Sequence, residues 1–142
     1  MNEIFKIKPK DIDISYFSES EMDRFDIVFG YTNTNGLDMA KAKFNNVDND
    51  RLVGVILYPV VDIDPTKQYI AGNYMVGSKI DIMTKGEATM ILPKKWKLPQ
   101  GQPLYVNGKG KIGWRRTIFP IGHTTSSQDI EGRVDAILDF EV

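Results

Sequence analysis

Short apolar segments separated by turn-forming residues make up most of the chain. These segments are rich in Ile, Val, Tyr, Phe and Thr, and Gly, Pro, Asn and Asp interrupt them at short intervals. This pattern predicts several short β-strands and places helix in the minority. The predicted strands cover residues 26–31, 52–58, 80–83, 88–92, 104–106, 111–114 and 133–140. Segment 52–58 is the most apolar run, and its length and β-branching predict a buried strand at the centre of the core.

Glycine marks the connections between these strands. Asn107-Gly108 supplies the positive φ angles of a tight turn and predicts a hairpin joining 104–106 to 111–114. Gly86 allows two interpretations, a hairpin turn between 80–83 and 88–92 or a bulge within one long strand. Short helices are predicted at residues 18–24 and 127–131, where serine precedes acidic residues.

These elements predict a mostly β fold, a single small β-barrel or β-sandwich-like domain with short helices, formed by residues 23–142. The length of 142 residues suits one domain and leaves little room for a second core. Residues 1–22 predict an extended N-terminal arm, because they alternate Ile, Phe and Asp with a proline and little glycine. The arm either pairs with a neighbouring molecule or folds back onto its own body.

Composition narrows the function classes. Hydrophobic residues make up 42% of the chain and charged residues 26%, as in ordinary globular proteins. The absence of cysteine excludes disulfides, thiolate zinc sites and cysteine nucleophiles. A net charge of −1 provides no overall field toward nucleic acid or an anionic membrane. No segment predicts a signal peptide or a membrane span, so we expect a soluble protein made in the cytoplasm.

Several motifs suggest chemistry, but their context favours simpler interpretations. Residues 108–113 match G-x-G-x-x-G, yet the β-branched, aromatic and proline-stopped continuation predicts a β-turn, since a dinucleotide site requires a helix there. His123 lies close to Ser126, Ser127 and Asp129 on one polar turn, whereas catalytic triads are assembled from separate elements. We therefore expect no catalytic residue and no enzyme activity.

Two acidic segments resemble metal ligands only in part. Residues 46–51 alternate oxygen ligands as calcium loops do, but they lack the sharp-turn glycine and the closing glutamate. Residues 62–65 resemble the end of a strand that runs into a proline turn. A single histidine without cysteine leaves no transition-metal ligand set. We therefore predict neither a metal site nor a cofactor.

Two basic clusters that each contain a tryptophan lie at residues 94–97 and 109–116. They could stack bases and neutralise phosphates, as in a barrel that binds single-stranded nucleic acid. Acidic residues elsewhere cancel their charge, and Trp and Arg also dominate protein–protein interfaces. A protein interface or a half-buried core tryptophan is therefore favoured over nucleic acid. The nucleic-acid alternative requires four side chains to converge on one groove: Trp96, Trp114, Arg115 and Arg116.

The order of several motifs is similar to that of a known family. In sequence these are LVGV at 52–55, VGSKIDIMTKGEA at 76–88, GQPLYVNGKGK at 101–111, FPIG at 119–122 and RVDAIL at 133–138. From about residue 23 onward the chain resembles the small β-barrel head-decoration, or capsid-cement, proteins of bacteriophages. The basic insertion at 94–99 and the arm before residue 23 depart from the family pattern and leave the attachment site open.

The resemblance implies a structural virion protein that docks on the outer face of the capsid, often as a homotrimer, and clamps neighbouring major capsid protein subunits. It implies no catalytic residue, no cofactor and no membrane partner, and a location on the virion after synthesis in the host cytoplasm. This function predicts a barrel with an exposed apolar arm and no convergent polar pocket. The expected contact residues are Ile4, Phe5, Ile7, Ile12, Ile14, Tyr16, Phe17, Trp96 and Trp114. The alternatives are a head-fibre or tail component and a single-stranded nucleic-acid-binding barrel.

Overall fold

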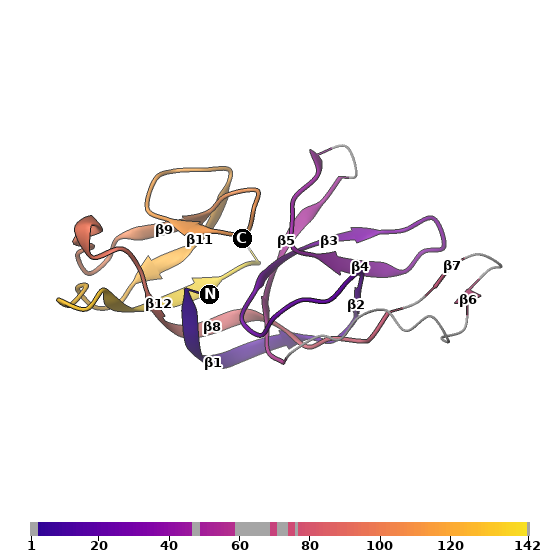
Figure 1. Cartoon of the computed structure of the whole chain (residues 1–142), viewed down its shortest axis with the longest axis horizontal. Helices are drawn as coiled ribbons and strands as arrows, with labels where there is room; N and C mark the ends of the chain where they lie inside the picture. The colour runs from indigo at the N-terminus through magenta and orange to yellow at the C-terminus, as the bar shows by residue number, and fades with distance from the viewer. Residues whose placement is uncertain (1–2, 47–48, 59–68, 71–73, 76, 142) are drawn as a thin grey trace.

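The computed structural model describes residues 3–46, 49–58, 69–70, 74–75 and 77–141, and the chain is all-β (Figure 1). The strands are β1 (Ile4–Asp13), β2 (Phe17–Ser18), β3 (Ile27–Thr32), β4 (Asp38–Lys41), β5 (Arg51–Ile56), β6 (Tyr69–Ile70), β7 (Tyr74–Met75), β8 (Ile82–Ile91), β9 (Pro103–Val106), β10 (Ile112–Gly113), β11 (Phe119–Thr124) and β12 (Arg133–Asp139); a 3-10 turn, η2, spans Lys94–Trp96. The prediction of a mostly β fold is confirmed. The acidic segment 62–65 lies outside the described residues.

The main sheet has ten strands and is open. Its strands follow the order β10-β9-β11-β12-β8-β5-β3-β4-β2, with β1 paired to β8 beside this path. All pairings are antiparallel except that of β2 with β4, so the sheet is mixed. The end strands β10 and β2 do not pair with each other, so the sheet is not closed and the barrel alternative of the predicted fold is wrong.

The long strand β8 explains why the sheet does not close. One edge of β8 pairs with β1 along nearly its whole length, and the other edge is divided between β12 and β5. The sheet therefore splits into two lobes that share β8. Figure 1 shows β9, β11 and β12 on one side, β2, β3 and β4 on the other, and β1 and β8 along the lower side. Each lobe ends in its own edge strand.

A hydrophobic core joins the two lobes. Its buried members include Phe29 and Val55 from one lobe, Leu104 and Leu138 from the other, and Met90 from β8. Burial of such side chains contributes about 1.5–3 kcal/mol each to folding. A second cluster, which includes Val28, Val53, Ile56 and Ile82, packs against Tyr16, Met22 and Ile80. Segment 52–58 accordingly supplies side chains to both clusters, which confirms its predicted place in the core.

The two glycine-marked segments have different structures. Residues 82–91 are one continuous strand, so the single-strand interpretation of Gly86 is confirmed and the hairpin alternative is wrong. A Cβ on Gly86 would lie 2.5 Å from the Lys8 carbonyl oxygen, which shows how closely β1 approaches. The hairpin of β9 and β10 is confirmed, but Asn107-Gly108 does not supply its positive φ angle, which lies at Gly110 (φ +77°). Asn107 instead stabilises the turn through its side chain, whose Oδ1 accepts from the Lys109 and Lys111 N–H groups.

The two predicted helices do not form, although both segments are described. Ser18 is buried in β2, where it pairs with Ala40 of β4, and residues 19–24 form bends and turns instead of a helix. In the second segment, Asp129 Oδ1 accepts hydrogen bonds from the Glu131 and Arg133 N–H groups. Such local side-chain bonds compete with helical hydrogen bonding and favour a turn.

The N-terminal arm folds back onto the chain's own sheet. β1 runs antiparallel to β8, from Ile4 opposite Met90 to Asp13 opposite Ile82. Of the two alternatives for the arm, this arrangement is the one in which it pairs with its own body. Ile4 is buried in the main core and Tyr16 in the second cluster, so both ends of the arm are fixed.

Candidate binding groove

A groove of about 570 Å³ lies beside β9 and β10, where the two tryptophan clusters of the sequence meet. Three aromatic and three cationic side chains line it: Trp96, Tyr105, Trp114, Lys95, Lys111 and Arg115. None of the described residues that line it carries a carboxylate. Figure 1 labels β9, the strand that contains Tyr105. We call this surface the aromatic–basic groove.

One wall of the groove is the 3-10 turn η2. Pro93 precedes the turn, the Trp96 N–H donates to the Pro93 carbonyl, and Lys97 ends the turn with φ +48°. The Gln128 side chain fixes this segment from across the fold: its Oε1 accepts from the Leu98 N–H and its Nε2 donates to the Leu92 carbonyl. Trp96 is partly buried against the main core, so its ring is held in place.

The loop that follows β10 also lines the groove. Trp114 is 38% exposed, and the Arg115 guanidinium carbon lies 5.3 Å from the centroid of its ring. Thr117 holds the loop against β9, because its hydroxyl donates to the Val106 carbonyl at 2.7 Å and accepts from the Phe119 N–H. The exposed tryptophan therefore belongs to an anchored loop.

Two half-buried carboxylates lie next to the groove on the far side of Lys111. Glu3 Oε2 accepts from the Ile112 N–H at 2.9 Å; burial raises the pKa of Glu3, and this hydrogen bond and the charge of Lys111 partly oppose the rise. Burial likewise raises the pKa of Asp26, against the hydrogen bond from the Asp23 N–H and the charge of Lys111. Glu3, Asp26 and Lys111 line one small cavity of about 30 Å³. Lys111 is therefore already opposed by negative charge.

The other two cations of the groove have a different environment. Within the part of the chain that the structure describes, neither Lys95 nor Arg115 forms a salt bridge. Arg115 instead stacks on Trp114. Cations next to exposed aromatic rings, with no acid in the lining, favour an anionic ligand that also has an apolar or aromatic part.

The groove unites part of the predicted site. Trp96, Trp114 and Arg115 meet there, whereas Arg116 is exposed and does not line it. The expected arm contacts are elsewhere. Ile4 and Tyr16 are buried, Ile7 and Phe17 are half-buried, and Phe5, Ile12 and Ile14 are 40%, 50% and 58% exposed.

Some groove residues could be found from the sequence and others could not. Tyr105 had a signal, because strand alternation directs it outward when Leu104 and Val106 are buried. Glu3 had none, since 109 positions separate it from Ile112.

The remaining motifs have structural roles. His123 belongs to β11 and is exposed, so its predicted place on a turn is wrong; it is opposite Pro103 and Ile137. Within the calcium-like segment, Asp50 pairs with Lys41 Nζ at 2.8 Å and accepts from the Asn45 N–H. No group of three His, Asp or Glu side chains among the described residues could hold a metal ion.

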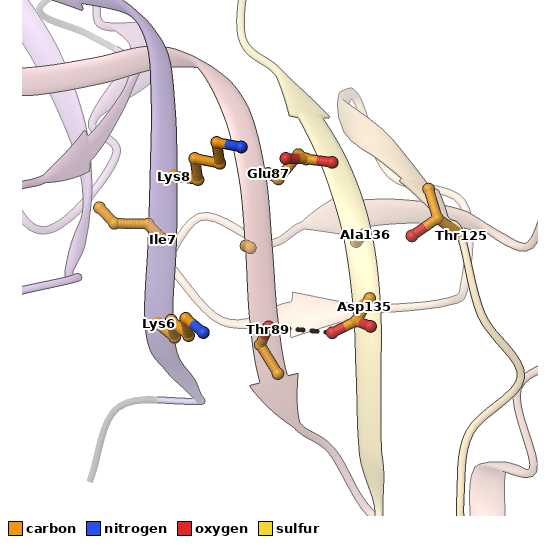
Figure 2. A pocket seen from close by; sticks show the side chains of 9 residues that line it. Lys6, Ile7, Lys8, Glu87, Thr89, Thr125, Asp135 and Ala136 are labelled. Atoms are coloured by element: carbon orange, nitrogen blue, oxygen red, sulfur yellow. Dashed lines mark hydrogen bonds between the residues drawn. The ribbon is translucent and has the colours of Figure 1, made fainter.

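A second, polar groove of about 260 Å³ lies over strands β1, β8 and β12 (Figure 2). Lys8 is opposite Glu87 and Lys6 is opposite Thr89, whose hydroxyl donates to Asp135 at 2.9 Å. Figure 2 shows these side chains rising from three adjacent strands. Opposite charges in neighbouring strands are typical of a solvated sheet face. We call this surface the polar groove.

None of the described helical segments is long and apolar enough to cross a membrane. Comparison of the sequence with models of known protein families and with curated proteins gives no match.

Proposed function

We propose that the chain is a structural protein of a bacteriophage virion that binds the outer surface of the capsid shell and stabilises it. The observation that carries the proposal is the aromatic–basic groove, in which Trp96 and Trp114 come together from separate segments beside Arg115. Trp and Arg are enriched among the residues that dominate protein–protein binding energies. The order of sequence motifs supplies the class of partner, the major capsid protein.

The structure changes which surface we propose as the contact. The arm is paired with β8 along β1, so it is no longer a free strand for a neighbouring sheet. The groove lies on anchored elements and therefore loses little conformational entropy on binding. Each copy would contribute a modest interface, and repetition over the shell would make release of the protein slow.

Co-sedimentation with empty, undecorated shells of the parent phage tests the proposal. We expect saturable binding of the intact chain that persists at moderate salt. Deleting the arm would remove β1 and Ile4 from the fold, so the double variant Ile12→Ser, Ile14→Ser is the suitable test of an arm contact. Because these side chains lie away from the groove, the variant should bind as the wild type does. Failure of the intact chain to sediment with shells at low and moderate salt would refute the proposal.

Single-stranded nucleic acid is the second candidate, and one observation favours it. Trp96, Trp114 and Arg115, three of the four side chains that this function requires, line the same groove. Base stacking on such rings contributes about 1–3 kcal/mol per base. A fluorescence titration with oligo(dT) measures this function, which predicts tight binding with a steep dependence on salt.

A further inference from the structure

We propose that the aromatic–basic groove binds an extended, acidic segment of a partner protein. Carboxylates of this segment contact Lys95 and Arg115, and its apolar side chains pack on the groove's aromatic rings. The inference rests on the proposed function and specifies the chemistry of the partner surface that this site recognises.

The charge of the groove selects an anionic partner. Lys95 and Arg115 have no salt bridge with any described residue, and no described lining residue carries a carboxylate that would repel an acid. The Arg115 guanidinium lies over the Trp114 ring, beside the surface that a ligand would cover. A planar guanidinium forms paired hydrogen bonds with a carboxylate, which gives both strength and orientation.

The same groove also selects an apolar component. Trp114 is exposed although it lies on an anchored loop, and Tyr105 also lines the groove. Aromatic rings held in this way bury large areas at a small entropic cost. A ligand that carries only charges would leave the aromatic rings exposed to solvent. A segment with both acidic and apolar side chains would cover the rings and also contact the cations.

The environment of Lys111 favours a peptide over nucleic acid. A phosphate backbone carries a charge at every nucleotide and is followed by a continuous cationic track. Here Lys111 faces Glu3 and Asp26, and these carboxylates would repel phosphates. Arg116 does not extend the track, because it lies outside the groove. The groove therefore matches a ligand with a few separated carboxylates.

Fluorescence anisotropy with a short labelled peptide tests the inference. The peptide alternates Glu with Leu and Ser; its Gln-for-Glu counterpart and an oligo(dT) of similar length serve as competitors. We expect Arg115→Gln to weaken binding of the Glu peptide about tenfold, as for loss of a charge-assisted hydrogen bond. Trp114→Ala should weaken it about tenfold or more.

Arg116→Gln is the matched control. It removes the same charge from the neighbouring exposed position, so we expect less than about a twofold change. Unfolding midpoints of the three variants establish that each remains folded. Failure of the Glu peptide to bind, equal binding of the Gln peptide, equal loss in the two arginine variants or tighter binding of oligo(dT) would each overturn the inference.

Shell co-sedimentation of the same variants separates this inference from the proposed function. Loss of shell binding in Trp114→Ala and Arg115→Gln would support both. Normal shell binding by variants that no longer bind the peptide would overturn the acidic segment as the shell contact and leave the proposed function standing. If the wild-type chain binds the peptide but does not bind shells, the proposed function is refuted and the inference of an acidic ligand for the groove still holds.

Discussion

The aromatic–basic groove and the polar groove use charged side chains in opposite ways. In the polar groove, cations and carboxylates occupy neighbouring positions: Lys8 is opposite Glu87 in the strand register, and Thr89 donates to Asp135 on the adjacent strand. In the aromatic–basic groove, Lys95 and Arg115 are each next to a tryptophan, and none of the described lining residues is acidic.

The difference supports the aromatic–basic groove as the surface that we propose binds a ligand. A sheet face with alternating charges is already favourable in water, and a partner would have to displace those interactions. Exposed rings beside cations gain from being covered, because apolar area leaves water and the charges gain a partner. The number of charged side chains on a surface is therefore a weaker indication of binding than the residues that surround them.

The largest expected effect comes from filling the narrow space between β1 and β8, two of the strands beneath the polar groove. In Gly86→Ala, the new Cβ would lie 2.5 Å from the Lys8 carbonyl oxygen and force β1 away from β8. We expect a loss of about 3 kcal/mol in the free energy of unfolding, measured by urea denaturation. Gly113→Ala is the control, because its Cβ would meet no atom within 4 Å. Equal losses in the two variants would contradict this account.

The two tryptophans of the aromatic–basic groove should contribute differently to the free energy of unfolding. Trp96 packs against the core, so Trp96→Ala should lower the free energy of unfolding by about 2 kcal/mol. Trp114 is more exposed, so Trp114→Ala should lower it by only about 0.5 kcal/mol or less. Thermal and urea unfolding measure both values. A larger loss for Trp114 would show that this ring serves mainly to stabilise the fold.

Single lysine substitutions compare the two grooves directly. Lys95→Gln should weaken shell binding about two- to fivefold, because one cation of the aromatic–basic groove is lost. Lys8→Gln removes a charge opposite Glu87 and should leave shell binding unchanged. Both should alter the free energy of unfolding by about 0.5 kcal/mol or less. A stronger effect of Lys8→Gln on sedimentation would move the contact to the polar groove.

The smallest expected effect is a pH dependence beside Lys111. Burial raises the pKa of Asp26 above 3.8, so the unfolded chain loses this proton at lower pH than the folded chain does. The contribution of this carboxyl to stability is therefore greatest below pH 3.8 and declines as pH rises through the raised pKa. Urea denaturation across this range should show that wild type loses stability relative to Asp26→Asn as pH rises. An opposite slope would contradict the direction of the shift.

Local sequence signals predicted most strands but could not predict their arrangement. The turn residues at 107–110 predicted the β9–β10 hairpin, although its positive φ angle lies at Gly110 and not at Asn107-Gly108. The apolar run at 52–58 predicted a core strand, because burial follows from local hydrophobicity. The open sheet depends on how β8 shares one edge between β12 and β5, which no local pattern records. The predicted barrel failed for this reason.

The groove was predictable in its parts and not in its assembly. Both basic clusters with tryptophan were visible in the sequence, but their meeting depends on long-range contacts. Gln128 fixes the 3-10 turn from 30 positions beyond Leu98, and Glu3 reaches Ile112 from the other end of the chain. The arm shows the same limit: its alternating isoleucines indicated an extended strand correctly, but the sequence could not decide between a neighbouring molecule and its own body, and the partner is β8 of the same chain.

The outer edge of β1 has a consequence for crowding. Among the described residues β1 pairs only with β8, so its other edge faces outward, and it carries Lys6, Lys8 and Lys10 with Pro9 between them. Its register with β8 is irregular at three points. Lysines, a proline and bulges are how natural sheets discourage further strands from joining an exposed edge. Many copies could therefore be held at high local concentration without fusing into aggregates through this strand.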